Sequence, residues 1–217
     1  FDANITNLEH TSTDIRIDTE SDVFRTTYVF DSRPIQQHFT MYQVFLGYKV
    51  SKSNKDISAF LMDFQDSDEF NFVYVLPFQN NTILFETTYF TSKCFKADEM
   101  RDKLESYIQK SIGNEYTKIS EEYGVIPMSS RITNSQYRTN WYKLGIPSGA
   151  TRGSTGYTFI NIQKQCDYYI DLINGNSSSD PFNTFTRRVL RYMDGVILQI
   201  IRDNPNKAQK IIYKMFQ

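Results

Sequence analysis

One acidic side chain lies inside an otherwise apolar strand pattern, and its position suits acid catalysis. Residues 70–90 read as two apolar strands around a Pro-Phe-Gln-Asn-Asn turn, and Glu86 lies within the second strand. A carboxyl among aromatic and aliphatic neighbours is costly to desolvate unless it is paired or protonated. From the residues alone, a strand-edge or ion-paired glutamate is the ordinary interpretation of Glu86, and a protonated carboxyl that serves chemistry on an apolar substrate is the alternative.

A glycine-rich loop between Gly145 and Tyr157 is the second candidate for chemistry. Its glycines would let the backbone approach a ligand, and the helix expected after it would point free N–H groups toward the loop. Such an arrangement can bind an anion or a carbonyl oxygen. The alternative is a plain loop, because the sequence has neither a Gly-Lys-Ser/Thr phosphate loop nor a G-x-G-x-x-G fingerprint.

Composition narrows the classes of function. With 24 basic and 25 acidic residues, the chain has no basic excess for binding nucleic acid. No run of about 18 apolar residues is present that could span a membrane. With only two histidines, a zinc site or a Ser-His-Asp triad is not expected, and Cys94 and Cys166 are expected to be reduced intracellular thiols. The 17 Phe and 15 Tyr fit a large apolar cavity or an ordinary aromatic core.

Apolar runs and turn signals predict an α+β fold. Residues 1–36 read as short strands, including one run over Val23–Phe30, and an antiparallel meander of aromatic strands follows. The meander strands are expected at Phe39–Val50, Ser58–Gln65, Phe70–Pro77 and Thr82–Thr91. A helix is expected over Ala97–Ile112, where apolar residues recur at helical spacing before Gly113.

The C-terminal half is expected to be mainly helical. A short strand at Gly124–Met128 and a loop region at 129–155 precede helices at 156–174, from Asp180 to Asn204, and at 207–217. The long middle helix carries an apolar stripe that favours core packing over a membrane face. Its members are Phe182, Phe185, Val189, Met193, Val196 and Ile200.

Seven segments, in order along residues 28–200, resemble the lycopene β-cyclase family of flavoproteins, bacterial type. They are Val29–Pro34, Phe45–Tyr48, Leu61–Phe64, Phe72–Phe78, Leu84–Thr88, Gly124–Met128 and Ser154–Thr158, and Leu190–Asp194 is also similar. The resemblance implies an antiparallel β-sheet substrate domain with C-terminal helices, the remainder of a two-domain, Rossmann-containing FAD-binding flavoprotein. It also implies that the natural protein is longer at the N-terminus.

The same resemblance implies a division of the chain and roles for single residues. Residues 1–36 would end the FAD-binding domain, 37–123 would form the substrate domain with its helix, 124–175 would return to the FAD domain, and 176–217 would form C-terminal helices. Glu86 and Asp63 match acidic positions of the family and are the expected catalytic residues. FAD, in reduced form with NAD(P)H as indirect reductant, would be bound by Asp31, Ser32, Gly149, Gly153, Thr155, Gly156 and Tyr157.

Two positions depart from the family pattern. Thr87 stands where the Glu86 motif has a second acid, although some bacterial relatives also lack it. Lys49 stands where some members carry an acid, two residues after the glycine of Phe-Leu-Gly-Tyr. Both departures bear on proton transfer.

The implied activity is an acid-catalysed, non-redox cyclisation of the linear ends of lycopene to β-ionone rings. It needs a protonated carboxyl in an apolar site and aromatic faces that stabilise a cation by about 0.5–2 kcal/mol each. Candidate rings are Tyr74, Phe85, Tyr89 and Phe90. The implied partners are the carotenoid substrate and a membrane surface, with the protein in the cytoplasm at the inner membrane. An FAD-dependent monooxygenase or oxidoreductase and a non-catalytic binder of apolar ligands are the alternatives.

We expect the 217-residue chain alone to bind no FAD, because the loop offers only part of a cofactor site and the pyrophosphate-binding turn is not in this sequence. The purified chain should be colourless, with no flavin absorbance after reconstitution. A yellow protein with one flavin per chain would contradict this expectation.

Overall fold

The computed structural model describes residues 3–34, 39–52, 57–130, 136–176 and 178–215. The chain forms two compact units. Unit 1 comprises Phe1–Gln37, Arg131–Arg152 and Tyr157–Leu190, and unit 2 comprises His38–Ser130, Gly153–Gly156 and Arg191–Gln217. The structure therefore confirms a mixed α and β architecture with antiparallel sheets, but the division expected at residue 124 falls inside a strand of unit 2.

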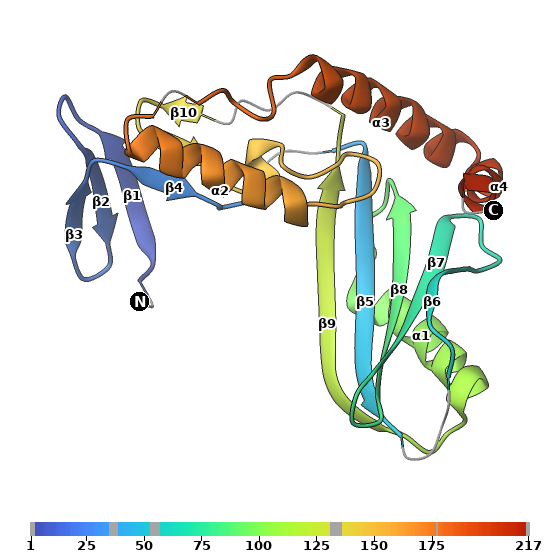
Figure 1. Cartoon of the computed structure of the whole chain (residues 1–217). Coiled ribbons are helices and arrows are strands. Elements are labelled where there is room, and N and C mark those ends of the chain that lie inside the picture. The colour runs from blue at the N-terminus through green and yellow to red at the C-terminus, as the bar shows by residue number, and fades with distance from the viewer. Residues whose placement is uncertain (1–2, 35–38, 53–56, 131–135, 177, 216–217) are drawn as a thin grey trace. The chain divides into compact units, whose positions relative to one another are not determined.

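Unit 2 is built on one five-stranded antiparallel sheet in the order β6-β7-β8-β5-β9 (Figure 1). The strands are β5 (Met41–Ser51), β6 (Phe60–Phe64), β7 (Phe70–Phe78), β8 (Thr82–Thr91) and β9 (Thr117–Met128). The expected strands are present, but the expectation of a simple meander is wrong because β5 lies between β8 and β9. Strand β9 is also longer than expected, since the polar start of this edge strand lacks an apolar pattern.

Helix α1 (Ala97–Ile112) covers one face of this sheet and has the predicted bounds (Figure 1). Its first turn is capped by Glu99, whose carboxylate accepts the Lys96 backbone N–H at 2.6 Å. The buried stripe of Met100, Leu104, Ile108 and Ile112 packs on apolar residues of β5, β7 and β8. This packing holds alternate strand residues against α1, and the residues between them therefore face the opposite side of the sheet.

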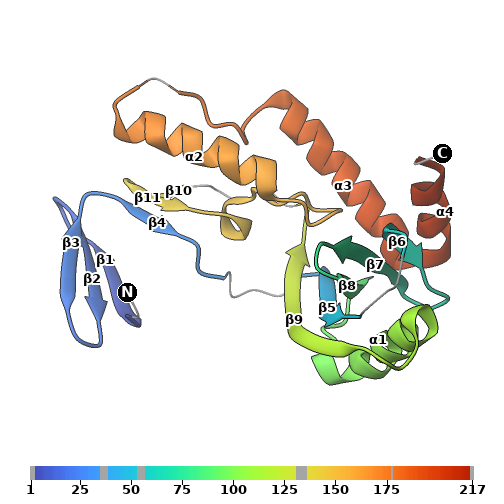
Figure 2. The ribbon, with the colours of Figure 1, turned by 60° about the horizontal axis from the view of Figure 1, so that its bottom comes forward.

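The opposite face of the sheet packs on the C-terminal helices α3 (Phe185–Asp203) and α4 (Pro205–Met215), beside β6 and β7 (Figure 2). Its core joins strand residues to helix residues: Met41, Phe70, Phe72, Phe90 and Met128 with Leu198, Ile201 and Ala208. Helix α3 ends before Asn204-Pro205, as the sequence predicts, and α4 begins at Pro205, two residues earlier than expected.

Two expectations for α3 are wrong. Asp180 and Pro181 form a turn instead of the helix start, and Thr184 caps the helix by accepting the Arg187 N–H on its hydroxyl at 3.2 Å. The apolar stripe is mostly exposed, with Phe185 81% and Met193 54% exposed. The buried face instead carries Arg187, Asp194, Leu198 and Ile201. Because two of these residues are charged, the spacing of apolar residues does not identify this face.

Unit 1 holds two small sheets and a helix. Strands β1 (Ile5–His10), β2 (Ile15–Thr19) and β3 (Val23–Thr26) form an antiparallel sheet. Strands β10 (Gln136–Arg138), β11 (Trp141–Lys143) and β4 (Val29–Asp31) form the other, with β11 parallel to β4. The run expected as one strand over Val23–Phe30 is thus split. Helix α2 (Phe159–Ile173) follows the glycine loop, in which Ile146–Ser148 form one 3₁₀ turn.

Candidate functional site

Glu86 lies inside the sheet of unit 2, on the face that α1 does not cover. In β8 it pairs with Tyr74 of β7 on one side and with Gly47 of β5 on the other, and Gly47 pairs in turn with Glu122 of β9. Directly opposed residues of antiparallel strands share a face, so these four residues form one row across the sheet. Because Gly47 has no side chain, nothing on that residue separates the two glutamates.

The surroundings of Glu86 favour its protonated form. Burial is the largest influence and raises the pKa of Glu86, a hydrogen bond from Thr88 Oγ1 to Glu86 Oε1 at 2.9 Å lowers it, and the charge of Glu122 raises it again. No basic side chain pairs with Glu86 in the part of the chain that the structure describes. Since β8 is an interior strand, a strand-edge or ion-paired glutamate does not describe this residue.

Aromatic rings share this face. Tyr74 is paired with Glu86, and the Phe72 ring lies 5.1 Å from that of Tyr74 and 5.6 Å from that of Phe90, centroid to centroid. The Phe45 ring lies flat over Gly124, where a Cβ would meet its Cζ at 2.4 Å. The rings form an apolar, electron-rich surface beside the carboxyl.

Only half of the rings proposed from the sequence lie on this face. Tyr74 and Phe90 do, whereas Phe85 and Tyr89 point to the opposite face and belong to the core under α1. Phe85 contacts the ring of Tyr107, and Tyr89 contacts that of Phe95. Strand alternation produces this division.

The sheet separates Asp63 from Glu86. Asp63 pairs with Val73, whose side chain packs under α1, and its carboxylate accepts a hydrogen bond from Tyr107 of α1. Burial raises the pKa of Tyr107, and this hydrogen bond raises it further. The two expected catalytic carboxyls therefore cannot act on the same atom of a substrate.

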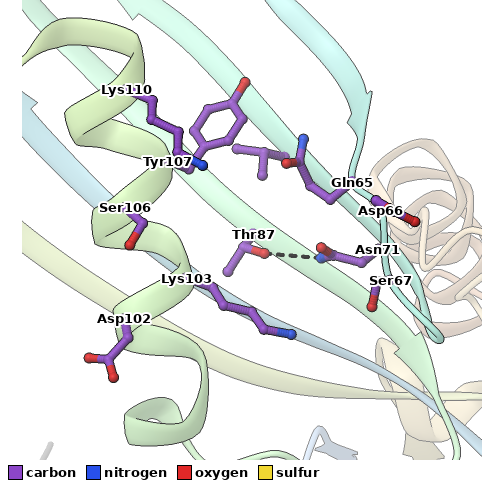
Figure 3. Close-up of a pocket in the computed structure, with 11 residues that line it drawn as sticks. Gln65, Asp66, Ser67, Asn71, Thr87, Asp102, Lys103, Ser106, Tyr107 and Lys110 are labelled. Carbon is purple, nitrogen blue, oxygen red and sulfur yellow. Dashed lines mark hydrogen bonds between the residues drawn. The ribbon is translucent and has the colours of Figure 1, made fainter.

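A polar pocket of about 380 Å³ opens on the α1 side of the sheet (Figure 3). Lys103 and Lys110 of α1 form one wall, and the buried Asn71 donates from Nδ2 to Thr87 Oγ1 at 3.0 Å in the floor (Figure 3). Amides and charges in the lining do not suit an apolar substrate. Thr87, at the position of the family's second acid, points into this pocket and away from Glu86.

The Gly153–Gly156 part of the glycine loop belongs to unit 2 and packs closely within it. A Cβ on Gly153 would lie 2.4 Å from the Ser129 carbonyl oxygen, and one on Gly156 would lie 2.1 Å from Gln43 Oε1. These glycines are required by packing within the protein. Gln43 pairs with Phe90 and so shares the face of Glu86, which means that this part of the loop approaches the sheet on the face of Glu86.

Two buried polar groups lie against this part of the loop: Asp194 is hydrogen-bonded to it, and Gln43 is close to Gly156. Asp194, 2% exposed, accepts hydrogen bonds from Ser154 Oγ at 2.6 Å and from the Gly153 N–H at 3.3 Å. Gln43 Oε1 is buried and has no hydrogen-bond partner. An orphan acceptor beside a glycine turn fits a bound group that carries a donor, and Thr155 beside it is exposed.

In unit 1, the remaining cofactor candidates differ in accessibility. Asp31 ends β4 as expected, but its carboxylate is held by Arg33 Nε at 2.9 Å and by Trp141 Nε1 at 3.3 Å, and the Arg33 hydrogen bond lowers the pKa of Asp31. Gly149 has a left-handed backbone, with φ of 78°, and its carbonyl accepts from Arg187. Ser32 and Tyr157 are exposed.

Three residues of the site were not singled out from the sequence. Glu122 lies in a polar run just before the strand expected at Gly124, and reading strand alternation back into that run would have found it. Gln43 and Asp194 are polar residues inside apolar patterns, which is the same signal that identifies Glu86. Their contacts depend on long-range pairing that no local pattern shows.

Comparison with known proteins gives one family and a shared fold. The family model described as lycopene cyclase protein matches residues 2–203. Among solved structures, a geranylgeranyl bacteriochlorophyll reductase-like protein from Thermoplasma acidophilum aligns at 11% identity with a TM-score of 0.56, over 98% of this chain and 54% of that one. A flavin-dependent halogenase from Xanthomonas campestris aligns at 11% identity with a TM-score of 0.54, over 92% and 41%. The chain thus spans about half the length of these proteins, and no curated protein matches it.

Replacing Ser154 by Ala should lower the free energy of unfolding by about 1.5–3 kcal/mol, because it removes a donor from a buried carboxylate. Urea unfolding of the chain measures this. The matched control is Thr155→Ala, an exposed neighbour that should change stability by less than about 0.5 kcal/mol. Equal effects of the two substitutions would show that the Ser154–Asp194 hydrogen bond does not anchor the loop.

Proposed function

This chain belongs to the lycopene cyclase family, and we propose that the full-length protein cyclises the linear ends of lycopene to β-ionone rings without net oxidation. The observation that carries the proposal is Glu86, a carboxyl in an interior strand whose pKa is raised by burial and which faces aromatic rings. An acid that protonates an alkene, yet keeps its proton near neutral pH, needs such surroundings. The protein would then be an isomerase of the intramolecular lyase type.

The proposed reaction moves protons and carbon–carbon bonds only. Glu86 gives its proton to the terminal double bond, whose π electrons form the new C–H bond and leave a tertiary cation. A neighbouring double bond attacks this cation and closes the ring. A ring proton then leaves to a carboxylate and a ring double bond forms, so no electrons are gained or lost overall.

The face around Glu86 suits the cationic stage. Tyr74 and Phe45 are the rings proposed to face the cation, and each cation–π contact is worth about 0.5–2 kcal/mol. Aromatic rings do not trap a cation as a water molecule or a thiol would, so a dry site protects the intermediate. The polar pocket beside Asp63 lacks these properties, and we assign Asp63 a structural role through Tyr107.

We propose FAD as cofactor, in reduced form with NAD(P)H as an indirect reductant. The fold is shared with a flavin-dependent enzyme, and the orphan acceptor of Gln43 beside Gly156 fits a bound group with a donor. Thr155 in unit 2, and Ser32 and Tyr157 in unit 1, are the exposed candidates for contacting it. Bound reduced flavin would supply an electron-rich ring that stabilises a cation or relays a proton.

Replacing Glu86 by Gln in the full-length protein should lower cyclase activity by about 10²- to 10⁴-fold, because it removes the transferable proton and keeps the size of the side chain. Carotenoid products in a lycopene-producing cell measure this, with flavin content and solubility as checks on folding. Asp63→Asn is the matched control and should keep most of the activity.

Other outcomes would change either the identity of the acid or the proposed function. Normal β-carotene from Glu86→Gln would show that the proton comes from another group. Oxygenated carotenoid from the unmodified protein would indicate a monooxygenase, and unchanged lycopene would indicate a non-catalytic binder.

We also propose that the protein works at the cytoplasmic surface of the inner membrane, where lycopene is dissolved. No helix in the described ranges is long and apolar enough to cross a membrane. One side of α3, however, exposes a row of large apolar residues: Phe185, Val189, Tyr192, Met193 and Val196. An exposed apolar stripe on a helix is typical of interfacial membrane contact.

The double substitution of Phe185 and Tyr192 by Ser should weaken binding of the full-length protein to phosphatidylglycerol-containing vesicles by about tenfold or more, because two exposed aromatic side chains no longer enter the lipid. Co-sedimentation measures this. Ile170→Ser with Ile173→Ser, two exposed apolar residues of α2, is the matched control and should have little effect. Unchanged binding by the α3 variant would show that α3 does not contact the membrane.

A further inference from the structure

We propose that Glu122 is a positioning residue for the catalytic acid: its ionised carboxylate, one strand beyond Gly47 in β9, keeps the proton on Glu86 until the substrate takes it. The inference rests on the proposed role of Glu86 as acid. It comes from the register, in which Gly47 is paired with Glu86 on one side and with Glu122 on the other.

The geometry allows the two carboxyls to influence each other. Neighbouring strands lie about 4.8 Å apart, so the backbones of Glu86 and Glu122 are about 10 Å apart with only Gly47 between them. A Cβ at Gly47 would touch Glu86 at 3.6 Å, so even a small side chain there would stand against the acid. Two like charges at this range repel each other, more strongly over a partly apolar surface than in bulk water.

The two glutamates have different surroundings, and this assigns their roles. Glu86 is partly buried in an interior strand, whereas Glu122 is exposed in the edge strand β9. Burial favours the neutral form of Glu86, and ionising it would place a second negative charge on the face that carries Glu122. The pKa of Glu86 is raised by burial first and by Glu122 in addition.

The other ionisable groups on this face do not cancel the effect. Tyr74 of β7 is neutral, and the same burial and the charge of Glu86 raise its pKa. Lys49 of β5 is a cation on the face of Glu86, but its Nζ lies 5.9 Å from the Phe78 ring centroid, toward the β7–β8 turn, and among the described residues the one charge that shifts the pKa of Glu86 is that of Glu122. Thr88 donates a neutral hydrogen bond to Glu86.

The adjacent Glu121 provides a built-in comparison. It pairs with Tyr48 on the α1 face and accepts from Arg101 at 2.7 Å and from Lys118 at 2.9 Å, and these hydrogen bonds lower its pKa to about 2. Glu121 is therefore a carboxylate of the same strand whose charge is neutralised on the other side of the sheet. Removing it should leave Glu86 unaffected.

The test is the pH dependence of cyclase activity in the full-length holoenzyme. Activity should fall as pH rises, when Glu86 loses its proton. Glu122→Gln removes the like charge and lowers the pKa of Glu86, so this fall should begin at lower pH. At a pH on the falling side, the variant should lose about 3- to 10-fold, and at low pH it should match the unmodified enzyme. Glu122→Asp keeps the charge and should keep the original profile, as should Glu121→Gln.

The outcomes separate this inference from the proposed function. If Glu86→Gln is inactive but the Glu122→Gln profile superimposes on the original one, the inference is wrong and the acid assignment stands. A loss of activity in Glu122→Gln that is equal at every pH would also overturn it, because a positioning charge acts only through the protonation of Glu86. If Glu86→Gln remains active, the acid assignment itself has failed, whatever Glu122 does.

Discussion

The pairing of β5 with β8 on one side and β9 on the other is the constraint on which the candidate site depends. It places Gly47 between Glu86 and Glu122, and it brings Gln43 to the loop at Gly156. A slip of one residue in either pairing would turn every side chain of that strand to the other face. The packing of α1 opposes such a slip, because it would move Leu46 and Val50 out of the core. Packing on the α1 face thus fixes the register, and this register places Glu86, Gly47 and Glu122 in one row on the other face.

The two faces of the sheet differ in how far their buried polar side chains are hydrogen-bonded. On the α1 face, the side chains of Asn71, Thr87 and Asp63 have hydrogen-bond partners, which makes that side stable and polar in its pocket. On the other face, Glu86 has one neutral donor, Thr88, and aromatic neighbours. A carboxyl in these surroundings keeps its proton near neutral pH, because its ionised form would be poorly solvated. This difference in surroundings is the physical ground for ranking Glu86 above Asp63 as the proposed acid.

Local patterns predicted the elements well and the contacts poorly. Helix α1 and strand β8 were located at their true bounds, because apolar spacing and the flanking turn residues define both. The start of α3 was misplaced because Asp180-Pro181 imitates a helix cap. Glu86 was found because an acid interrupts an apolar strand, whereas Asp63 was added by the family resemblance, and the structure places the two on opposite faces. Which carboxyl shares a face with Glu86 depends on strand order, which is a long-range property.

The glycines show which features of the site local sequence patterns identify and which they miss. Gly153 and Gly156 were selected as places where a ligand approaches the backbone, but protein atoms fill both positions. Gly47, which no loop or turn rule selects, lies between Glu86 and Glu122 in the register of the sheet, and the influence proposed for Glu122 depends on that position. A side chain in the middle of a strand normally packs with its cross-strand neighbours. At Gly47 a Cβ would instead meet Leu84 Cδ1 at 3.5 Å and Glu86 at 3.6 Å, so side chains of β8 lie against the bare backbone of β5.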